Sequence, residues 1–250
     1  MITELKRMIC GSKADSYKCK TTRHEYDDIV RTLPTVYKLA RMQRKLAIVY
    51  DLHADKVLMF CNGLSSHYQP TFQAYSKENA FDFFASIESG DKTAIESFYA
   101  GGYRFLENCP AQERSNYMQA FDFHWQSPAG QRLHFVQQNY VYHSDRKGKP
   151  WFLLLIIYPF PRVLKGLTFR HSIINIEQKR LVIPSNIQFL TLHELSLLDL
   201  IDLGFDNEAI ASHYGIAYNT VNNHRSNILV RTDTSKIEHA ILRVRITGLL

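Results

Sequence analysis

The sequence predicts an α+β protein in which an antiparallel five-stranded sheet with helices precedes a bundle of four short helices. Three observations support this prediction. Apolar residues recur in five short runs between positions 46 and 158, which is typical of strands. Turn residues separate several of these runs at the spacing of β-hairpins. After position 190 the apolar residues instead recur every three or four positions, which is typical of helices.

The first two thirds of the chain are predicted to contain both strands and helices. A helix is expected over His24–Arg44, although Pro34 favours a break because proline lacks a backbone N–H donor. The polar turn at residues 53–55 separates two apolar runs and predicts a hairpin. The elements expected after that helix are strands at Leu46–Leu52 and Lys56–Leu64, helices at Lys77–Ile87, Asp91–Phe105 and Ala111–Tyr117, and strands at Phe121–Trp125, Leu133–His143 and Trp151–Tyr158.

The residue pattern in the last third of the chain predicts two helices, a tight turn and a third helix. Thr191 and Glu194 form a capping box, which starts helices, and Gly204 is placed to end the helix that follows. Gly215 turns the chain between the second and third helices, because glycine tolerates a positive φ. The predicted inward residues of these helices are Leu195, Leu198, Ile201, Ile210, Ala211, Tyr214, Val221 and Ile228.

A fourth helix is predicted near the end of the chain. Ser235 and Glu238 match a second capping box. Leu242 and Ile246 fall outside the apolar stripe of this helix, so we expect them to be available for pairing in a dimer. The stripe itself comprises Ile237, Ala240, Ile241 and Val244.

The region Leu190–Leu250 resembles the helix-turn-helix of the LuxR/FixJ/NarL-type bacterial transcription regulators. The residues that carry the resemblance are Leu190-Thr191, Glu194, Leu198, Leu200-Ile201, Gly204, Asn207, Ile210-Ala211, Ile216, Thr220-Val221, His224-Arg225, Asn227-Ile228, Ala240 and Gly248-Leu249-Leu250. The resemblance implies that the third helix enters the major groove of double-stranded DNA. The chain departs from the family pattern at Glu208, Ala209 and Asn222, where basic residues are usual.

Helical geometry sorts the residues of the third predicted helix by their expected role. At 100° per residue, Val221 and Ile228 point inward, and His224 is expected to be a packed flanking residue. Asparagine can pair bidentately with adenine, and serine can hydrogen-bond most base edges. We therefore expect Asn222, Asn223 and Ser226 to read bases, Thr220, Arg225 and Arg231 to hold phosphates, and Asn219 to share the DNA-binding face.

The distribution of charge argues against strong non-specific binding to DNA. The whole chain carries a formal charge of +6. The segment from Ser185 to Leu250, however, contains five Lys/Arg and seven Asp/Glu, which gives it a formal charge of −2. DNA affinity depends largely on Lys/Arg neutralising phosphates. The segment before Leu46 contains eleven Lys/Arg and five acids. This basic N-terminal extension could therefore assist DNA contact or bind an acidic partner.

The region Lys45–Pro161 resembles a PAS domain, a five-stranded antiparallel sheet with helices on one side. The residues that carry this resemblance are Ala47–Asp51, Asn62-Gly63, Ile87–Asp91 and the Asp145…Gly148…Pro150 turn. It implies a sensory or dimerisation domain. The expected organisation is a basic helical extension at 1–44, a PAS-like domain at 45–161, a linker at 162–185 and a helix-turn-helix domain at 186–250. Ile173-Ile174 and Leu181-Val182-Ile183 predict that the linker packs against another part of the chain.

The cysteines and histidines do not predict a metal or a cofactor. Cys10, Cys19 and His24 lack an evident fourth zinc ligand. Cys61-Asn62 reverses the Asn-Cys order of a photosensory flavin domain, and Cys61 is expected in the core. Cys109 belongs to no Cys-x-x-Cys pair. A haem would need an axial histidine, and the candidates are expected at the surface or in packing: His67, His124, His134 and His143.

The sequence therefore predicts a sequence-specific DNA-binding transcription regulator and not an enzyme, since no nucleophile–base pair is apparent. Asp27-Asp28 follows no apolar strand, which excludes a response-regulator receiver domain.

The expected partners are double-stranded DNA and a second copy of the chain, with RNA polymerase and a small-molecule or protein signal at the PAS-like domain as further candidates. No apolar run approaches the ~20 residues of a membrane span, so the expected location is the cytoplasm. The alternative is an interaction adaptor that keeps the fold but has weak or no DNA binding.

Overall fold

The computed structural model describes residues 23–66, 72–127, 129–160, 171–178, 180–182 and 190–247. The chain divides into two compact units, Met1–Pro161 and Arg162–Leu250. Several predictions concern residues outside the described ranges: the basic segment before Arg23 with Cys10 and Cys19, His67, Ile183, and Gly248-Leu249-Leu250.

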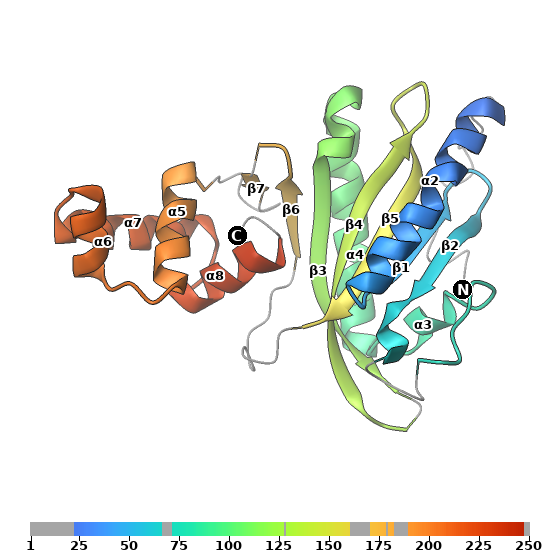
Figure 1. Cartoon of the computed structure of the whole chain (residues 1–250), viewed down its shortest axis with the longest axis horizontal. Helices are drawn as coiled ribbons and strands as arrows, with labels where there is room; N and C mark the ends of the chain where they lie inside the picture. The colour runs from blue at the N-terminus through green and yellow to red at the C-terminus, as the bar shows by residue number, and fades with distance from the viewer. Residues whose placement is uncertain are drawn as a thin grey trace. The chain divides into compact units, whose positions relative to one another are not determined.

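The first unit contains the antiparallel sheet that the sequence predicts. The strands are β1 (Leu46–Asp51), β2 (Lys56–Asn62), β3 (Tyr117–Gln126), β4 (Arg132–Ser144) and β5 (Pro150–Pro159). They lie in the order β2-β1-β5-β4-β3, and each is antiparallel to its neighbours (Figure 1). Helices α3 (Asp82–Ala85) and α4 (Ser89–Asn108) lie on one face, which confirms the fold that the PAS resemblance implies.

Two aspartates shape two of the hairpin turns of this sheet, the β1–β2 and the β4–β5 turns. Asp51 Oδ1 accepts hydrogen bonds from the backbone N–H groups of residues 53 and 54, both at 2.9 Å. Asp145 Oδ1 accepts from the N–H groups of residues 147 and 149, at 2.8 and 2.9 Å. Gly148 closes this second turn with a φ of +71°, and an added Cβ would lie 2.1 Å from the Cβ of Ala111. The turn therefore requires glycine for both its backbone conformation and its packing.

Helix α2 (Arg23–Met42) covers the other face of the sheet (Figure 1). It buries Ile29, Leu33 and Ala40 in a cluster with Ala47, Val49, Met59 and Cys61 of β1 and β2. The predicted break at Pro34 does not occur, because the helix continues through this residue. Pro34 is exposed, so water can satisfy the carbonyl that loses its intrahelical donor.

Aromatic side chains fill the space between the sheet and helices α3 (Asp82–Ala85) and α4 (Ser89–Asn108). Phe72, Phe83, Trp125 and Phe135 are fully buried and contact one another at ring-centroid distances of 5.1–6.3 Å. The Trp125 indole N–H donates to the Phe83 carbonyl at 2.7 Å. Two 3₁₀ helices, η2 (Gly63–Ser66) and η3 (Ala111–Asn116), complete the unit.

Helix α3 is much shorter than the helix predicted over Lys77–Ile87. The side chain of Asn79 binds local backbone groups, with its Oδ1 accepting from Ser76 N at 2.5 Å and its Nδ2 donating to the Ala74 carbonyl at 2.9 Å. Such side-chain bonds favour turns over helices, so the regular helix begins only at Asp82.

The described residues of the second unit form a hairpin and four helices. Strands β6 (His171–Asn175) and β7 (Arg180–Val182) pair within the region predicted as a linker, where Ile173, Ile174 and Leu181 are buried. The helices are α5 (Leu192–Asp202), α6 (Asn207–Tyr214), α7 (Tyr218–Arg231) and α8 (Ile237–Ile246). Among the described residues, no helix combines the length and apolar character needed to span a membrane.

The predictions for the fourth helix of the bundle need correction. Helix α8 begins at Ile237 with Lys236 as N-cap and has no side-chain capping bond, so the capping box expected at Ser235 and Glu238 is wrong. Lys236 has an extended backbone (φ −137°, ψ 145°), which shifts the start by one residue. Leu242 and Ile246 are buried, each 3% exposed, so they are not available to a dimer partner as expected.

Candidate nucleic-acid interface

Helices α6 and α7 are joined by a tight turn with well-formed caps. Asp206 Oδ1 accepts from Ala209 N at 2.8 Å and satisfies a free N–H at the start of α6. Gly215 ends α6 in the left-handed conformation, with φ +64° and ψ 33°. Ile216 N then donates to the Ala211 carbonyl at 3.0 Å, and α7 begins at Tyr218.

Burial fixes which side of α7 faces outward. Val221 and Ile228 are fully buried, as the sequence predicts. Asn219, Asn223 and Ser226 are exposed on the same helix. Val230 is also exposed, to 66%. These placements follow the helical geometry expected from the sequence, while contact of these side chains with bases stays a prediction.

Asn222 and Arg225 are half-buried and share one partner on α6. The Asn207 Nδ2 atom donates to Asn222 Oδ1 at 2.8 Å, and Arg225 Nη1 donates to Asn207 Oδ1 at 3.2 Å. No role for Asn207 was predicted from the sequence. The signal that could have singled it out is that Asn207 is among the residues that carry the family resemblance.

Arg231, expected to hold a phosphate, has an acidic partner inside the unit. Its Nη1 lies 2.6 Å from Glu194 Oε2, and the Glu194 side chain is only 3% exposed. The same oxygen accepts from the backbone N–H and hydroxyl of Thr191, at 2.8 and 2.9 Å. The capping box at the start of α5 is confirmed, and the Glu194–Arg231 pair connects it to the end of α7.

Two residues of α7 with predicted roles remain, Thr220 and His224. Thr220 is half-buried in the first turn of the helix. The His224 ring is half-buried and packs on His193, with ring centroids 4.8 Å apart. His193 in turn contacts Tyr214 of α6 at 4.7 Å. His224 is therefore a packing residue, as expected.

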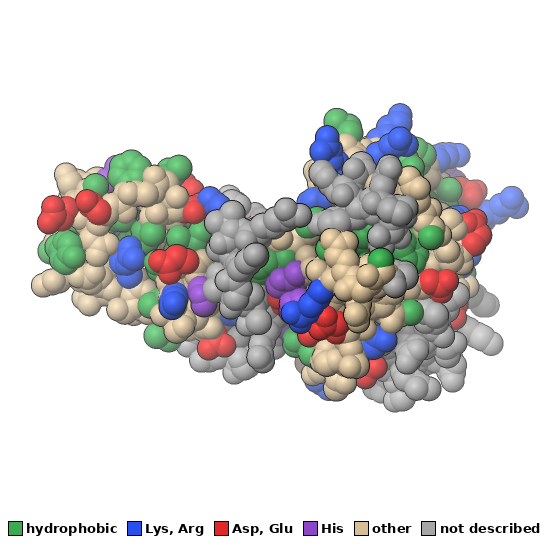
Figure 2. Space-filling view, turned by 90° about the horizontal axis from the view of Figure 1, so that it is seen from below, with side chains coloured by type: hydrophobic (Ala, Val, Ile, Leu, Met, Phe, Trp, Pro, Cys, Tyr) green, Lys and Arg blue, Asp and Glu red, His purple; other side chains and the backbone are tan. Residues whose placement is uncertain are grey.

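Two other cations of this unit are also held by its own residues. Arg243 is buried and donates to the Thr232 carbonyl, and Arg245 pairs with Asp202. On the face drawn in Figure 2, acidic and basic side chains of the helical unit are interspersed. The charge of Arg225, which is bonded to a neutral amide, and that of exposed Lys236 remain available to phosphates.

The first unit contains a cavity of about 400 Å³ beside the end of α2. Burial raises the pKa of the Cys61 thiol, which donates to the Tyr37 carbonyl at 3.6 Å, so this cysteine is not an activated nucleophile. The guanidinium and hydroxyl donors of the lining suit a polar or anionic small molecule. The lining residues are Tyr37, Arg41, Arg44, Cys61, Asn62, Gly63 and Ser65.

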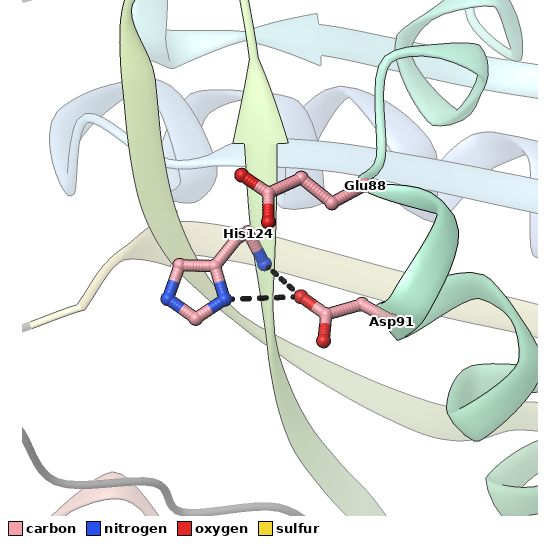
Figure 3. A group of neighbouring side chains, drawn as sticks. All are labelled: Glu88, Asp91 and His124. Atoms are coloured by element: carbon pink, nitrogen blue, oxygen red, sulfur yellow. Dashed lines mark hydrogen bonds and ion pairs between the residues drawn. The ribbon is translucent and has the colours of Figure 1, made fainter.

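Three possible metal ligands meet where α4 approaches β3: Glu88, Asp91 and His124 (Figure 3). Asp91 Oδ2 accepts from the His124 backbone N–H at 2.6 Å and lies 3.0 Å from its ring Nδ1. Arg132 donates two hydrogen bonds to Glu88, at 2.6 and 2.9 Å, and thereby lowers the pKa of that carboxyl. Both carboxylates therefore have partners within the chain, and the cluster ties the start of α4 to β3 and β4.

The second unit has the geometry of a helix-turn-helix DNA-binding domain: a capped helix, a left-handed glycine turn and a second helix with a polar outer face. Residues 188–244 match the family model described as bacterial regulatory proteins, luxR family. The chain therefore carries a LuxR-family helix-turn-helix domain.

Several solved structures share a distant likeness with most of the chain. A phage VqmA–DPO complex is 14% identical, over 91% of this chain and 92% of that chain, with a TM-score of 0.33. A Vibrio cholera VqmA–ligand–DNA complex is 13% identical, over 92% and 90%, with a TM-score of 0.30. An RNA-binding Light-Oxygen-Voltage receptor is 8% identical, over 82% and 53%, with a TM-score of 0.34. No protein of the curated set matches the chain. At these identities and TM-scores, the likeness assigns no activity to this chain.

Proposed function

We propose that this protein is a sequence-specific DNA-binding transcription regulator in which α7 enters the major groove. The observation that supports this most directly is the outer face of α7, where Asn219, Asn223 and Ser226 are exposed while the opposite side of the helix is fixed in the core. Amide and hydroxyl side chains hydrogen-bond to base edges. Asn222, Asn223 and Ser226 would read bases, and Thr220 and Arg225 would hold phosphates.

Two copies of the chain would bind two half-sites about one helical turn apart, as helix-turn-helix dimers do. The first unit would supply dimerisation and respond to a signal, either a small molecule or a protein. The cavity beside α2 offers room for the first kind of signal. RNA polymerase is a further partner of the DNA-bound dimer in this proposal, and the protein would act on DNA in the bacterial cytoplasm.

The experiment that tests this function is a selection from random double-stranded oligonucleotides with the full-length chain. We expect enrichment of a motif with two-fold symmetry. Asn223→Ala should relax the preference at one base pair per half-site by about 1–3 kcal/mol. Ser212→Ala, at an exposed position of α6, should leave the motif unchanged. A chain that enriches no motif at low salt would contradict the proposal.

An interaction adaptor is the second candidate, and the charges of the second unit favour it. Acids outnumber bases between Ser185 and Leu250, and Arg231, Arg243 and Arg245 have partners within the unit. The dependence of binding on salt separates the two functions, because each phosphate contact makes log K fall with log[salt]. An adaptor would show neither motif enrichment nor this dependence.

A further inference from the structure

The side-chain amide of Asn207 links two residues of α7 that face the proposed DNA interface. It accepts from Arg225 Nη1 at 3.2 Å and donates to Asn222 Oδ1 at 2.8 Å. Asn207 itself is the first residue of α6 and follows the N-cap Asp206. One amide thus connects the start of α6 to positions 222 and 225, which lie one helical turn apart.

The guanidinium group determines the orientation of both amides. Arginine has only donors, so the Asn207 atom that faces Arg225 must be its oxygen. The other end of that amide is then the NH₂ group, which can only donate. The Asn222 atom that receives this bond must therefore be Oδ1, and the Asn222 amide has a defined orientation.

This orientation determines what Asn222 can offer to a base. Its oxygen is directed toward α6, and its Nδ2 makes no hydrogen bond among the residues that the structure describes. Bidentate pairing with adenine needs both the oxygen and the NH₂ group of the amide on the same base edge. The bond from Asn207 uses one of the two lone pairs of this oxygen and fixes its direction toward α6, so the NH₂ group is the part of the Asn222 amide that is left to donate into the groove.

We infer that Asn207 is a positioning residue that presents Asn222 to DNA as a hydrogen-bond donor, so that Asn222 prefers guanine, which offers two acceptors in the major groove (N7 and O6), over adenine and thymine, which offer one each. This inference rests on the proposed DNA-binding function and deepens it. Residue type alone favours adenine for Asn222, and the contact with α6 changes that expectation.

The test compares base preference at one position of the selected motif. Asn222→Ala identifies that position as the base pair whose preference it removes. Asn207→Asp supplies an acceptor in place of the amide donor, so Asn222 must turn its NH₂ group to the new carboxylate and its oxygen to the groove. Preference should then change from guanine to a base with a donor, adenine or cytosine. A base contact of this kind discriminates roughly 5- to 150-fold.

Two further variants separate this inference from simpler effects. Asn207→Ala should reduce the wild-type preference at that position by roughly fivefold or more, with the other positions unchanged. Ala209→Asp adds the same charge in the same turn of α6 and should weaken binding to all sequences alike. Circular dichroism confirms that each variant is folded.

The possible outcomes are distinct. A switch with Asn207→Asp and a relaxed preference with Asn207→Ala are the expected results. If the wild-type chain selects a motif and both variants keep its guanine, or if the wild-type position is adenine, the inference is overturned while the proposed function stands. If the wild-type chain selects no motif, both are overturned.

Discussion

The carboxylate of Glu194, at the start of α5, lies 2.6 Å from the guanidinium of Arg231, at the end of α7. This pair connects the first helix of the bundle to the helix that carries the candidate DNA-binding residues. Glu194 is nearly inaccessible to water, and its carboxylate is bonded to Arg231 and to the N–H and hydroxyl of Thr191. The contact thus assigns Arg231 a stabilising role that its position in the sequence did not indicate.

Arg231→Met should destabilise the second unit by about 3 kcal/mol, since it leaves a buried carboxylate without its charged partner. Adding Glu194→Gln to this variant should recover part of the loss, because the buried charge is then absent. Urea unfolding followed by far-UV circular dichroism measures both effects. The tryptophans, Trp125 and Trp151, belong to the first unit, so their fluorescence serves as an internal control.

Arg245→Met is the matched control for this pair. Arg245 also pairs with an acid, Asp202, but its side chain is 59% exposed. Exposed ion pairs contribute less than about 1 kcal/mol. Equal losses for the Arg231 and Arg245 variants would show that burial of Glu194 does not matter.

The salt dependence of DNA binding should distinguish Arg225 from Arg231. Each lost phosphate contact reduces the slope of log K against log[salt] by about 0.9. Arg225→Met should therefore reduce the slope by about 2 per dimer, whereas Arg231→Met should leave it unchanged. A similar reduction for Arg231→Met would mean that its pair with Glu194 opens on DNA and that Arg231 holds a phosphate, as predicted from the sequence.

Gly215→Ala should destabilise the second unit by about 1–2 kcal/mol, because its φ of +64° is unfavourable for residues with a Cβ. No atom outside its chain neighbours lies within 4 Å of the added Cβ, so the cost is one of backbone conformation alone. Gly90→Ala, in the first turn of α4, is the control. A Cβ added to Gly90 would also have open space around it, and the φ of Gly90 is not positive, so the same substitution should stabilise the first unit by about 0.5–1 kcal/mol. Thermal unfolding of both variants checks the opposite signs.

His171 on β6 should make the second unit less stable in mild acid. Burial, together with the positive charge of Arg243, lowers the pKa of His171 from 6.5 to about 4. Between these pH values the unfolded chain binds more protons than the folded one, so stability falls as pH decreases through this window. The loss should reach about 2–3 kcal/mol at pH 4.5 relative to pH 7.

His171→Gln should remove most of this difference, while His213→Gln, at an exposed site on α6, should not. The measurement is the free energy of unfolding at pH 7 and pH 4.5 for the wild type and both variants. An unchanged pH dependence in the His171 variant would show that another group carries it.

Much of the fold was predictable because the relevant interactions are local. Thr191 and Glu194 are three residues apart, and their capping bonds form within one helical turn. Gly215 turns the chain through its own backbone freedom. The strands and the sides of α7 follow from periods of about two and 3.6 residues. The polar residues expected on the outer face of α7, Asn219, Asn223 and Ser226, are exposed for this reason.

Two of the predictions that failed concern residues whose environment depends on distant parts of the chain, whereas the capping box at Ser235 and the helix over Lys77–Ile87 failed for local reasons. Pro34 stays within α2 because its side of the helix faces water, and no local pattern reveals that. Leu242 and Ile246 are buried although they fall outside the apolar stripe assigned to α8. A single helical period describes one buried face, whereas contacts from more than one direction bury additional residues.

The sequence by itself determined that this chain contains a mixed sheet-and-helix region followed by a helix-turn-helix, because caps, turns and apolar periodicity act over a few residues. Only the tertiary structure decided which polar groups meet. Asn207 and Asn222 are fifteen residues apart, and Glu194 and Arg231 are thirty-seven apart. Hydrogen bonds and ion pairs require atoms within about 3 Å, and such approaches depend on how helices pack rather than on the order of residues along the chain.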